Sequence, residues 1–380
     1  MIYFDNAATT PIDPAVREAM LPFLHLQFGN PSSKYYSIAE KAKIAVNEAR
    51  SRIAELLGCE PEEVIFTSGS TESNNMILKG LSDEYWGSGK QIITSKAEHS
   101  SILETADYLQ SKGLIVIKVE VDSFGKVNLN DLEELLHSHK NNLLLISLIW
   151  GNNELGSINN IHAISTLCNN YSVAFHTDAT QVTGKLPINL SSMPIDFLSL
   201  SSHKIYGPKG IGAAVIKKNS LGIRTHITPL IHGGGQEFGY RSGTLNVPAI
   251  VGFGKAAEIA KRDMEMNIRH LETLDEYFSN KIKDKFDDIL QFNSPLSGKL
   301  PGILNIRFKG VHNELLIKKI AEDIAISSGS ACSSSKPSHV LQSIGCSLDE
   351  IRSSLRISFS KFNTLEEIDQ FIGLLSGDHT

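Results

Sequence analysis

Short apolar segments alternate with helical segments through most of the chain, and this alternation is the strongest constraint on its fold. Strand-like runs are expected at residues 64–66, 91–94, 114–119, 143–149, 172–176, 195–200 and 212–216. Helices are expected at about residues 37–57, from residue 70, and at 101–112, 129–137 and 161–169. The run 143–149 is apolar throughout, which is typical of a strand covered on both faces. The pattern predicts an α/β fold with a mostly parallel sheet wrapped by helices.

The last third of the chain has a different character. Residues 248–286 are rich in Ala, Lys, Glu and Met and predict one long helix. Beyond it we expect strands at residues 303–308, 324–327 and 355–359, and helices at 314–321, 338–344 and 365–375. Asp13 followed by Pro14 is typical of a helix start. We therefore predict a large domain at residues 14–256 and a smaller α+β domain formed by residues 1–13 and 257–380.

The composition argues against several classes of protein. The 380 residues carry 36 basic and 42 acidic side chains, a net charge of -6, so the basic footprint of direct nucleic-acid binding is missing. The four cysteines, Cys59, Cys168, Cys332 and Cys346, suggest neither a disulfide framework nor a metal site. The first residues lack the pattern of a leader and no apolar run reaches membrane-spanning length. We expect a soluble, cytoplasmic protein without a membrane partner.

Lys204 stands where an expected strand ends. It closes the run Ser-Ser-His-Lys at residues 201–204 and is followed by a Gly-Pro turn at residues 207–208. Burial at such a position disfavours the charged form of lysine, which lowers the pKa and frees the amine to form an imine. The alternative is a lysine whose side chain extends from the strand end to solvent.

Two other strand ends carry groups that would accompany such an amine. The turn at residues 67–73, Thr-Ser-Gly-Ser-Thr-Glu-Ser, precedes an expected helix. Its free N–H groups would suit a phosphate, and a capping box with Ser70 as the cap is the equal alternative. Asp178 either caps the segment after its strand or points into a ligand crevice. An anion site, a carboxylate for a pyridine nitrogen and an amine for an aldehyde are what pyridoxal 5'-phosphate requires.

Three further segments carry candidate reactive groups. His99 could stack on a flat cofactor and move protons, although a lone histidine is more often a packing residue. The glycine-rich connection at residues 232–244 is either a flexible hairpin or a donor array for phosphate. Cys332 lies among Ser and Gly residues close to Lys336, which favours a reactive thiolate over an incidental loop thiol. The other three cysteines are expected to be incidental.

Together these motifs resemble those of the cysteine desulfurases, pyridoxal-phosphate enzymes of the class-V aminotransferases with the fold-type-I architecture. The resemblance extends over essentially the whole chain, at residues 4–10, 28–33, 67–72, 98–99, 152–156, 178–181, 201–210, 233–244 and 327–332. The run Ser-Ser-Gly-Ser-Ala-Cys is similar to that of the housekeeping NifS/IscS-like subgroup. The resemblance implies that the large domain binds the cofactor and that the small domain carries the catalytic cysteine loop, at about residues 327–340.

The resemblance also implies a role for each matched residue. Lys204 would bind the cofactor covalently, His99 would stack on its ring and assist proton transfer, and Cys332 would be the nucleophile. The implied cofactor-binding residues are Ser70, Thr71, His99, Asn153, Asp178, Gln181, Ser201, His203, Lys204 and Thr244. Of these, Asp178 would pair with the pyridine nitrogen, Gln181 would bond the ring oxygen, and Thr244 would come from the other subunit of a homodimer. Asn153 and Arg356 would bind the substrate carboxylate.

The implied reaction converts L-cysteine to L-alanine and leaves a persulfide on Cys332, whose sulfur passes to an acceptor protein. Iron–sulfur cluster assembly, tRNA thiolation and DNA phosphorothioation are all compatible pathways. The sequence departs from the family at Ser202, where glycine is common, and in the segment after Cys332, which is shorter than in the iron–sulfur enzymes. A selenocysteine lyase or another class-V enzyme is the alternative activity. A non-catalytic sulfur-transfer scaffold is a third hypothesis, against which the intact Lys204, Asp178 and His99 argue.

Overall fold

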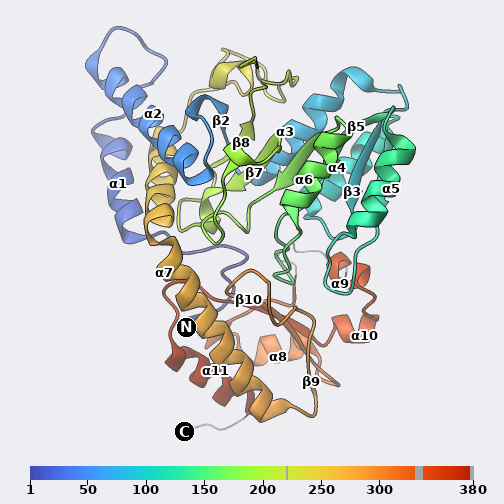
Figure 1. The fold of residues 1–380 in the computed structure, drawn as a ribbon. Helices are drawn as coiled ribbons and strands as arrows, with labels where there is room; N and C mark the ends of the chain where they lie inside the picture. Colours follow the sequence, from blue (N-terminus) through green and yellow to red (C-terminus); the bar gives the residue numbers. More distant parts are fainter. Residues whose placement is uncertain (220, 330–336, 377–380) are drawn as a thin grey trace.

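Two bodies of unequal size are joined by one long helix in the structure, a computed structural model (Figure 1). The structure describes residues 1–219, 221–329 and 337–376. The larger body, at the top of the figure, contains a seven-stranded sheet, and the smaller one contains a three-stranded sheet. The predicted fold, an α/β body with a smaller α+β body, is confirmed. The division into domains at residues 13/14 and 256/257 stays a prediction.

The large sheet is mostly parallel. Its strands are β2 (Val64–Thr67), β3 (Gln91–Ser95), β4 (Ile115–Val119), β5 (Leu143–Ser147), β6 (Ala174–Asp178), β7 (Phe197–Ser201) and β8 (Gly212–Ile216). They lie in the order β2-β8-β7-β6-β5-β3-β4, and β8 is the strand that runs antiparallel to both of its neighbours. The carboxyl ends of the parallel strands therefore meet at one edge, where ligands of α/β proteins bind.

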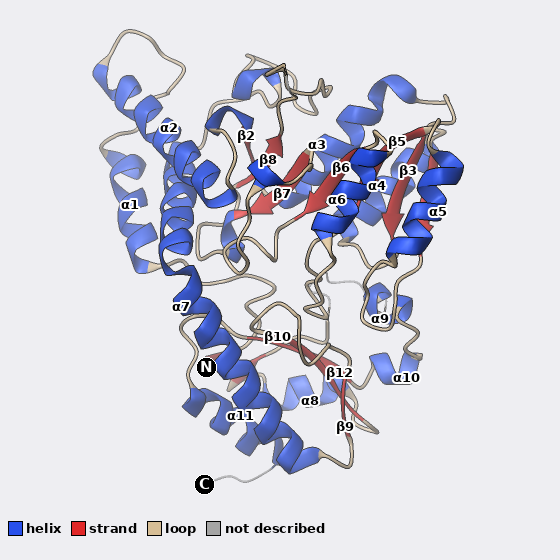
Figure 2. Cartoon of the chain, in the orientation of Figure 1, coloured by secondary structure: helices blue, strands red, loops and turns tan. Residues whose placement is uncertain are grey.

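Helices cover both faces of this sheet (Figure 2). One face is packed by α3 (Ser70–Ser82) and α4 (Ser100–Ser111). The other is packed by α1 (Pro14–His25), α2 (Ser37–Leu57), α5 (Leu129–His139), α6 (Ile161–Asn170) and the first part of α7 (Val247–Phe286). Asp13 caps α1 by accepting a hydrogen bond from the N–H of Ala15, as its sequence predicts. With both faces buried, the strands can be apolar throughout.

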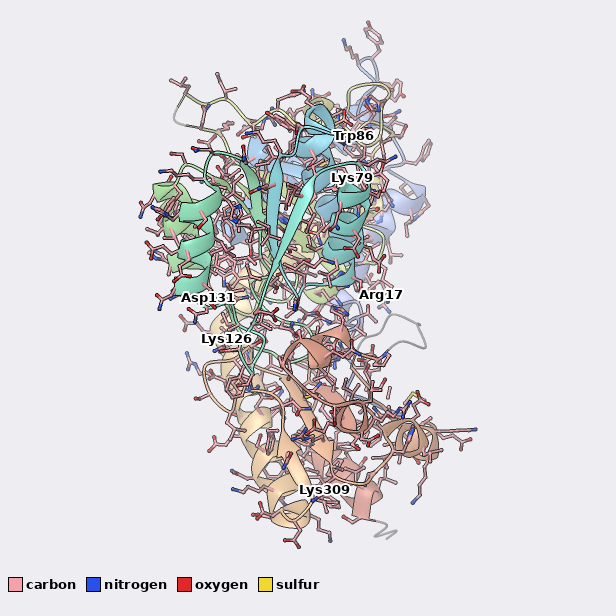
Figure 3. The ribbon with its side chains drawn as sticks, turned by 90° about the vertical axis from the view of Figure 1, so that its right-hand side faces the viewer. Arg17, Lys79, Trp86, Lys126, Asp131 and Lys309 are labelled. Atoms are coloured by element: carbon pink, nitrogen blue, oxygen red, sulfur yellow. The ribbon has the colours of Figure 1, made fainter. Side chains whose placement is uncertain are left out.

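The smaller body is built around the far end of α7. Leu271, Leu274, Phe278 and Ile282 pack into its core, whereas residues of α7 up to Ala260 pack into the core of the large body. Its sheet has the order β12-β10-β9, from Ser354–Ser358, Ile303–Phe308 and Leu290–Phe292. It also contains α8 (Asn313–Ile320), α9 (His339–Ser343), α10 (Leu348–Ile351) and α11 (Leu365–Ser376). Seen from the side, it lies directly below the large body, with Lys309 near its lower end (Figure 3).

The N-terminal segment connects the two bodies. Strand β1 (Ile2–Tyr3) pairs in parallel with β11 (Ile324–Ala325), and Phe4 is buried in the core of the smaller body. Ala7 is already part of the core of the larger one. The chain thus crosses from one body to the other within a few residues. Among the described residues, no helix combines the length and the apolar character that a bilayer crossing requires.

Candidate active site

A cavity of about 300 Å³ lies at the carboxyl edge of the large sheet, where residues of both bodies meet. The cavity is lined by nine of the site residues predicted from the sequence: Ser70, Thr71, His99, Asn153, Asp178, Gln181, His203, Lys204 and Arg356. Ser201 lines an adjoining hollow of about 370 Å³, which shares Ser70, Thr71 and His203 with the cavity. Thr244 is exposed and lines neither space, and Cys332 lies outside the described residues. The cavity is of a size that suits a small-molecule ligand.

Lys204 follows β7 in a short turn, and its side chain reaches into the cavity. Its Nζ donates hydrogen bonds to the carbonyl oxygens of Ala7 at 2.5 Å and Ala8 at 2.7 Å. Burial lowers the pKa of Lys204 to about 7, and the nearby cations Arg356 and Lys185 add to this shift. The lysine therefore does not extend to solvent, and a large share of its amine is neutral near pH 7. A neutral, buried amine is a nucleophile for an aldehyde.

Asp178 ends β6 and is buried at the floor of the cavity. Its Oδ1 accepts a hydrogen bond from the N–H of Thr180 at 3.0 Å, and its Oδ2 accepts one from Asn74 Nδ2 at 2.8 Å. The residue therefore has both of the roles left open by the sequence, since it holds the next turn and lines the ligand cavity. Asn74 was not predicted from the sequence, although it lies three residues after Thr71 and so on the same face of α3.

His99 precedes α4 and caps it with its ring. Its Nδ1 accepts a hydrogen bond from the N–H of Ser101 at 3.1 Å and lies 2.8 Å from Ser101 Oγ. Burial lowers the pKa of His99; the Asp178 carboxylate opposes this shift, and the Lys204 cation adds to it. The ring is therefore neutral at physiological pH, and it lines the cavity rather than packing in the core.

The turn after β2 forms an anion site. Helix α3 begins at Ser70, and its N-cap residue is Gly69, which offers no side-chain cap, so the capping-box alternative is wrong. The first N–H groups of the helix are thus available to an anion. A Cβ on Gly212 would lie 2.6 Å from Gly69 Cα, so only glycine allows β8 to approach this turn. The hollow beside the turn is lined by Ser201 and His203, both predicted to bind the cofactor.

His203 contributes a neutral ring to this anion site. Its Nδ1 lies 3.0 Å from Thr9 Oγ1. Burial lowers the pKa of His203 to about 4, and the cations Lys204 and Lys209 add to this shift. Ser202, which the sequence suggested as a departure from the family it resembles, is buried next to it. A Cβ on Gly207 would lie 2.0 Å from Ser202 Oγ, so Gly207 supplies the room that the extra hydroxymethyl group needs.

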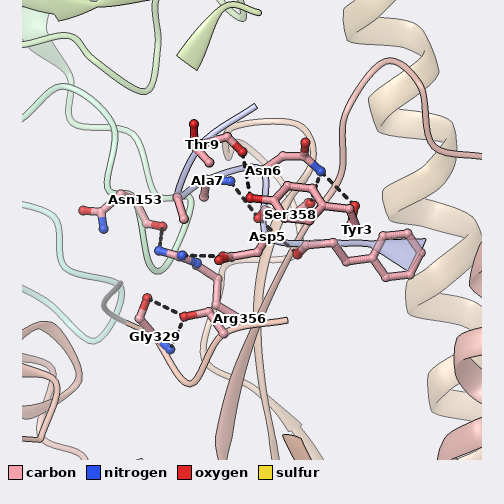
Figure 4. A network of polar contacts seen from close by, with 12 residues as sticks. Tyr3, Asp5, Asn6, Ala7, Thr9, Asn153, Gly329, Arg356 and Ser358 are labelled. Atoms are coloured by element: carbon pink, nitrogen blue, oxygen red, sulfur yellow. Dashed lines mark hydrogen bonds and ion pairs between the residues drawn. The ribbon is translucent and has the colours of Figure 1, made fainter. Parts of the chain in front are cut away.

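Arg356 enters the cavity from β12 of the smaller body (Figure 4). It is 1% exposed; Nη2 donates to Asp5 Oδ1 at 2.7 Å, and Nη1 donates to the carbonyl of Asn153 at 3.1 Å. Its Nε is buried and has no partner among the described residues. The residue nevertheless lines the cavity, and a guanidinium offers forked N–H donors that match a carboxylate. The side chain is therefore prepared to bind an acceptor such as a carboxylate.

Both flanks of the segment that contains Cys332 lie at this cavity. Before it, Ser327 pairs with Arg356 through backbone hydrogen bonds. After it, Ser338 Oγ donates to Glu154 Oε2 at 2.6 Å, and His339 Nε2 donates to the carbonyl of Glu98 at 2.7 Å. His339 lines the cavity but was not predicted from the sequence, and Glu154, within the matched residues 152–156, had no predicted role.

The other cysteines have unreactive surroundings. Burial raises the pKa of the Cys59 and Cys168 thiols to about 12, and it also raises the pKa of Cys346. A thiol that stays protonated is a poor nucleophile. This agrees with the prediction that these three cysteines are incidental.

The donor set fits a phosphorylated pyridine aldehyde. The uncapped N-terminus of α3 suits the phosphate, the Asp178 carboxylate suits a ring nitrogen, and the Lys204 amine suits the aldehyde. Gln181 Nε2, which donates to the carbonyl of Ala7 at 2.9 Å, is placed to bond a ring oxygen from the same wall. Each group that the cofactor requires is therefore present in one connected space.

Comparisons with known proteins agree with this chemistry. Residues 2–371 match the family model described as aminotransferase class-V. A cysteine desulfurase IscS of Rickettsia typhi is 44% identical over 98% of this chain and 90% of its own. A solved NifS-like protein superposes with a TM-score of 0.91 at 36% identity, over 99% of this chain and 98% of its own. The structure of SspA in complex with cysteine gives a TM-score of 0.82 at 37% identity, over 96% of this chain and 100% of its own. This chain therefore belongs to the class-V aminotransferase family, among the pyridoxal-phosphate-dependent cysteine desulfurases of the NifS/IscS-like group.

Proposed function

We propose that the protein removes the sulfur of L-cysteine and holds it as a persulfide on Cys332. The Cβ–S bond of cysteine breaks, Cβ gains a proton to give L-alanine, and a new S–S bond forms on the enzyme thiol. The observation that carries the proposal is the buried Lys204 amine, whose pKa is lowered to about 7 inside a cavity that also contains Asp178 and Arg356. A solved relative, SspA, binds cysteine, which supports cysteine as the substrate.

Each proposed cofactor contact uses a group described above. Lys204 holds the aldehyde, Asp178 the pyridine nitrogen and Gln181 the ring oxygen, while His99 and Asn153 contact the ring. Ser70, Thr71, Ser201 and His203 hold the phosphate at the N-terminus of α3. When bound, pyridoxal 5'-phosphate supplies an electron sink for the carbanion that follows loss of the Cα proton.

The chain's own residues bind and orient the substrate. Arg356 binds the carboxylate through the part of its guanidinium that lines the cavity, and Asp5 and Asn153 fix the guanidinium plane by accepting from Nη2 and Nη1. Lys204 takes up or returns the proton at Cα, because its neutral amine can accept a proton near pH 7. His99 excludes water from one side of the cavity and handles a proton at its ring. Cys332 receives the sulfur.

We also propose that the enzyme is a homodimer. Thr244 is exposed and lines neither its own cavity nor the adjoining hollow, so it is free to complete the phosphate site of the other subunit. Exposed apolar side chains also support a surface that a partner covers: Phe238 is 49% exposed, and Leu24, Leu26 and Phe28 are 60%, 67% and 70% exposed. Sedimentation equilibrium should give twice the monomer mass of 41.6 kDa.

The sulfur acceptor is proposed to be a protein in the cytoplasm. Iron–sulfur cluster assembly is the pathway suggested by the IscS relatives, and tRNA thiolation and DNA phosphorothioation remain alternatives. Persulfidated enzyme used as bait would identify the acceptor, because transfer of labelled sulfur from cysteine to the captured protein distinguishes an acceptor from a bystander.

The decisive experiment compares alanine and persulfide formation in three variants. Cys332→Ala should form no persulfide and little alanine, Lys204→Ala should form neither, and Cys346→Ala should match the parent enzyme because its thiol is not used. Full sulfide release by Cys332→Ala would instead favour a selenocysteine lyase or a related enzyme. A protein that shows no visible cofactor absorbance, even after the cofactor is added, would favour a non-catalytic scaffold.

A further inference from the structure

A chain of hydrogen bonds connects His99 to Asp178 through two residues that do not line the cavity. Asn74 is 0% exposed on α3, and its Nδ2 donates to Asp178 Oδ2 and to Ser101 Oγ, both at 2.8 Å. Ser101, in the first turn of α4, has its Oγ 2.8 Å from His99 Nδ1. Two helices and the end of β6 are thereby joined beneath the site.

The Asp178 carboxylate determines which way the Asn74 amide faces. A carboxylate only accepts hydrogen bonds, so the atom next to it has to be the amide nitrogen of Asn74. The reversed amide would place Oδ1 against a carboxylate oxygen and would leave Ser101 without its donor. Both N–H bonds of Asn74 are therefore used, one toward Asp178 and one toward Ser101.

The direction of the chain then determines the proton on His99. Because Ser101 Oγ accepts from Asn74, its own hydrogen is available for His99 Nδ1. The N–H of Ser101 donates to the same nitrogen at 3.1 Å. A ring nitrogen that accepts two hydrogen bonds carries no proton, so the single proton of the neutral ring lies on Nε2. Among the described residues Nε2 has no hydrogen-bond partner, and the ring lines the cavity.

We propose that Asn74 is a positioning residue, which joins Asp178 to Ser101 and thereby holds His99 as a neutral ring with its proton on Nε2. His99 then offers a hydrogen-bond donor to the cavity and resists a second proton, since protonation at Nδ1 would break the bond from the Ser101 N–H and reverse the bond from the Ser101 hydroxyl. The charged and titratable groups that face the ring are Asp178, Lys204 and His339. The inference rests on the proposed function for its catalytic meaning, but the proton position can be measured without turnover.

The test is nitrogen NMR of holoenzyme labelled with ¹⁵N-histidine, in which the shifts of the two ring nitrogens report the tautomer. A His99→Gln variant identifies the His99 signals among the 13 histidines. The parent enzyme should show a non-protonated Nδ1 and a protonated Nε2 from neutral pH down to pH values below the ordinary range of histidine. Asn74→Leu and Ser101→Ala should increase the population of the other tautomer and raise the pKa of His99, but only in part, because the backbone N–H of Ser101 still donates to Nδ1.

Activity provides a second readout. Asn74→Leu should lower kcat for alanine formation by about tenfold or more, less than the roughly 10²–10⁴-fold that loss of an acid–base group costs. Asn75→Leu is the matched control, because Asn75 is the next residue of α3 and its Nδ2 bonds only the carbonyl of Thr71. If Asn74→Leu does not fold, Ser101→Ala decides, since it keeps the backbone N–H bond to His99.

Unchanged His99 shifts and an unchanged pH titration in Ser101→Ala would overturn the inference, as would a parent enzyme with its proton on Nδ1. Neither result bears on whether the enzyme forms alanine from cysteine. Conversely, a protein with the expected tautomer that forms no alanine would contradict the proposed function and leave the inference intact.

Discussion

The buried ion pair between Arg50 and Glu237 controls the placement of the glycine-rich segment, and its removal gives a prediction with a defined magnitude. Arg50 Nη1 and Nη2 donate to the two carboxylate oxygens of Glu237 at 2.9 and 2.6 Å. Arg50 also bonds the carbonyl of Val64, and the N–H of Phe66 donates to Glu237 Oε2 at 2.7 Å. The pair thus joins α2 and β2 to the segment that leads to Thr244.

The backbone of this segment depends on that pair. Glu237 and Phe238 adopt positive φ angles of 50° and 58°, a region that non-glycine residues avoid. Such conformations cost on the order of 1–3 kcal/mol each and persist only where the surroundings hold them. The Arg50 guanidinium also lies 5.2 Å from the centre of the Phe238 ring. Loss of Arg50 therefore removes both a charge partner and a ring contact.

Arg50→Met should destabilise the protein by about 3–5 kcal/mol, because it leaves the Glu237 carboxylate buried without its cation. The measurement is urea unfolding of parent and variant at the same protein concentration. Arg17→Met is the control: Arg17 pairs with Glu18 on the surface, where the side chains are 67% and 61% exposed (Figure 3), so its loss should cost only about 0–1 kcal/mol.

The double variant Arg50→Met/Glu237→Gln should recover part of the loss, because a neutral amide at position 237 is less costly to bury than an unpaired carboxylate. A single-variant loss below about 1 kcal/mol would refute the reasoning, since that is what an exposed pair costs. A double variant no more stable than Arg50→Met would show that the buried charge is not the source of the loss.

Three other predictions follow from named contacts. Since the pKa of Lys204 is lowered to about 7, uptake of the cofactor by cofactor-free protein should accelerate as the pH rises through about 7. Stopped-flow absorbance would measure the rate of uptake. A midpoint near the ordinary pKa of lysine would contradict the lowered pKa of Lys204. Arg356→Gln should raise KM for cysteine by about 10- to 100-fold with a smaller effect on kcat, because one charge-assisted hydrogen bond is worth roughly 1.5–3 kcal/mol. An unchanged KM would exclude Arg356 from carboxylate binding. Gly80→Ala should lower the Tm of the protein, because the added Cβ would lie 2.0 Å from Ile227 Cγ2. The steric clash should outweigh the preference of about 1 kcal/mol that alanine has over glycine in helices. A rise in Tm would contradict the predicted clash.

The elements of the large body could be predicted because their signals are local. The apolar run at residues 143–149 and the strand at 212–216 correspond to β5 and β8, and the predicted helix at residues 37–57 has the bounds of α2. The candidate site could be predicted as well, because polar residues at the ends of parallel strands meet at one edge of a sheet. Asp178 and Lys204 end or follow the adjacent strands β6 and β7 and so share one cavity.

The contacts that tune the site could not be predicted, because they join residues far apart in the sequence. The Lys204 amine bonds two backbone carbonyls at residues 7 and 8, which no side-chain pattern could reveal. Asn74 reaches Asp178 across 104 positions, and Glu237 reaches Arg50 across 187. Each of these bonds depends on how elements pack, whereas the sequence pattern reports only which face of an element is apolar.

The N-terminal segment explains how the amine and the guanidinium of the site keep a fixed spacing. Asp5 holds Arg356, while the carbonyls of Ala7 and Ala8 hold Lys204, so both side chains are bound by residues 5–8. This stretch is anchored in the smaller body through Asn6 Nδ2, which donates to the carbonyl of Ser358 at 2.9 Å. Residues 5–8 therefore connect the two side chains through a short stretch of backbone, in addition to the direct bond from Arg356 to the carbonyl of Asn153. Because the Arg356 cation helps to lower the pKa of Lys204, the stretch that holds both side chains also contributes to the reactivity of the amine.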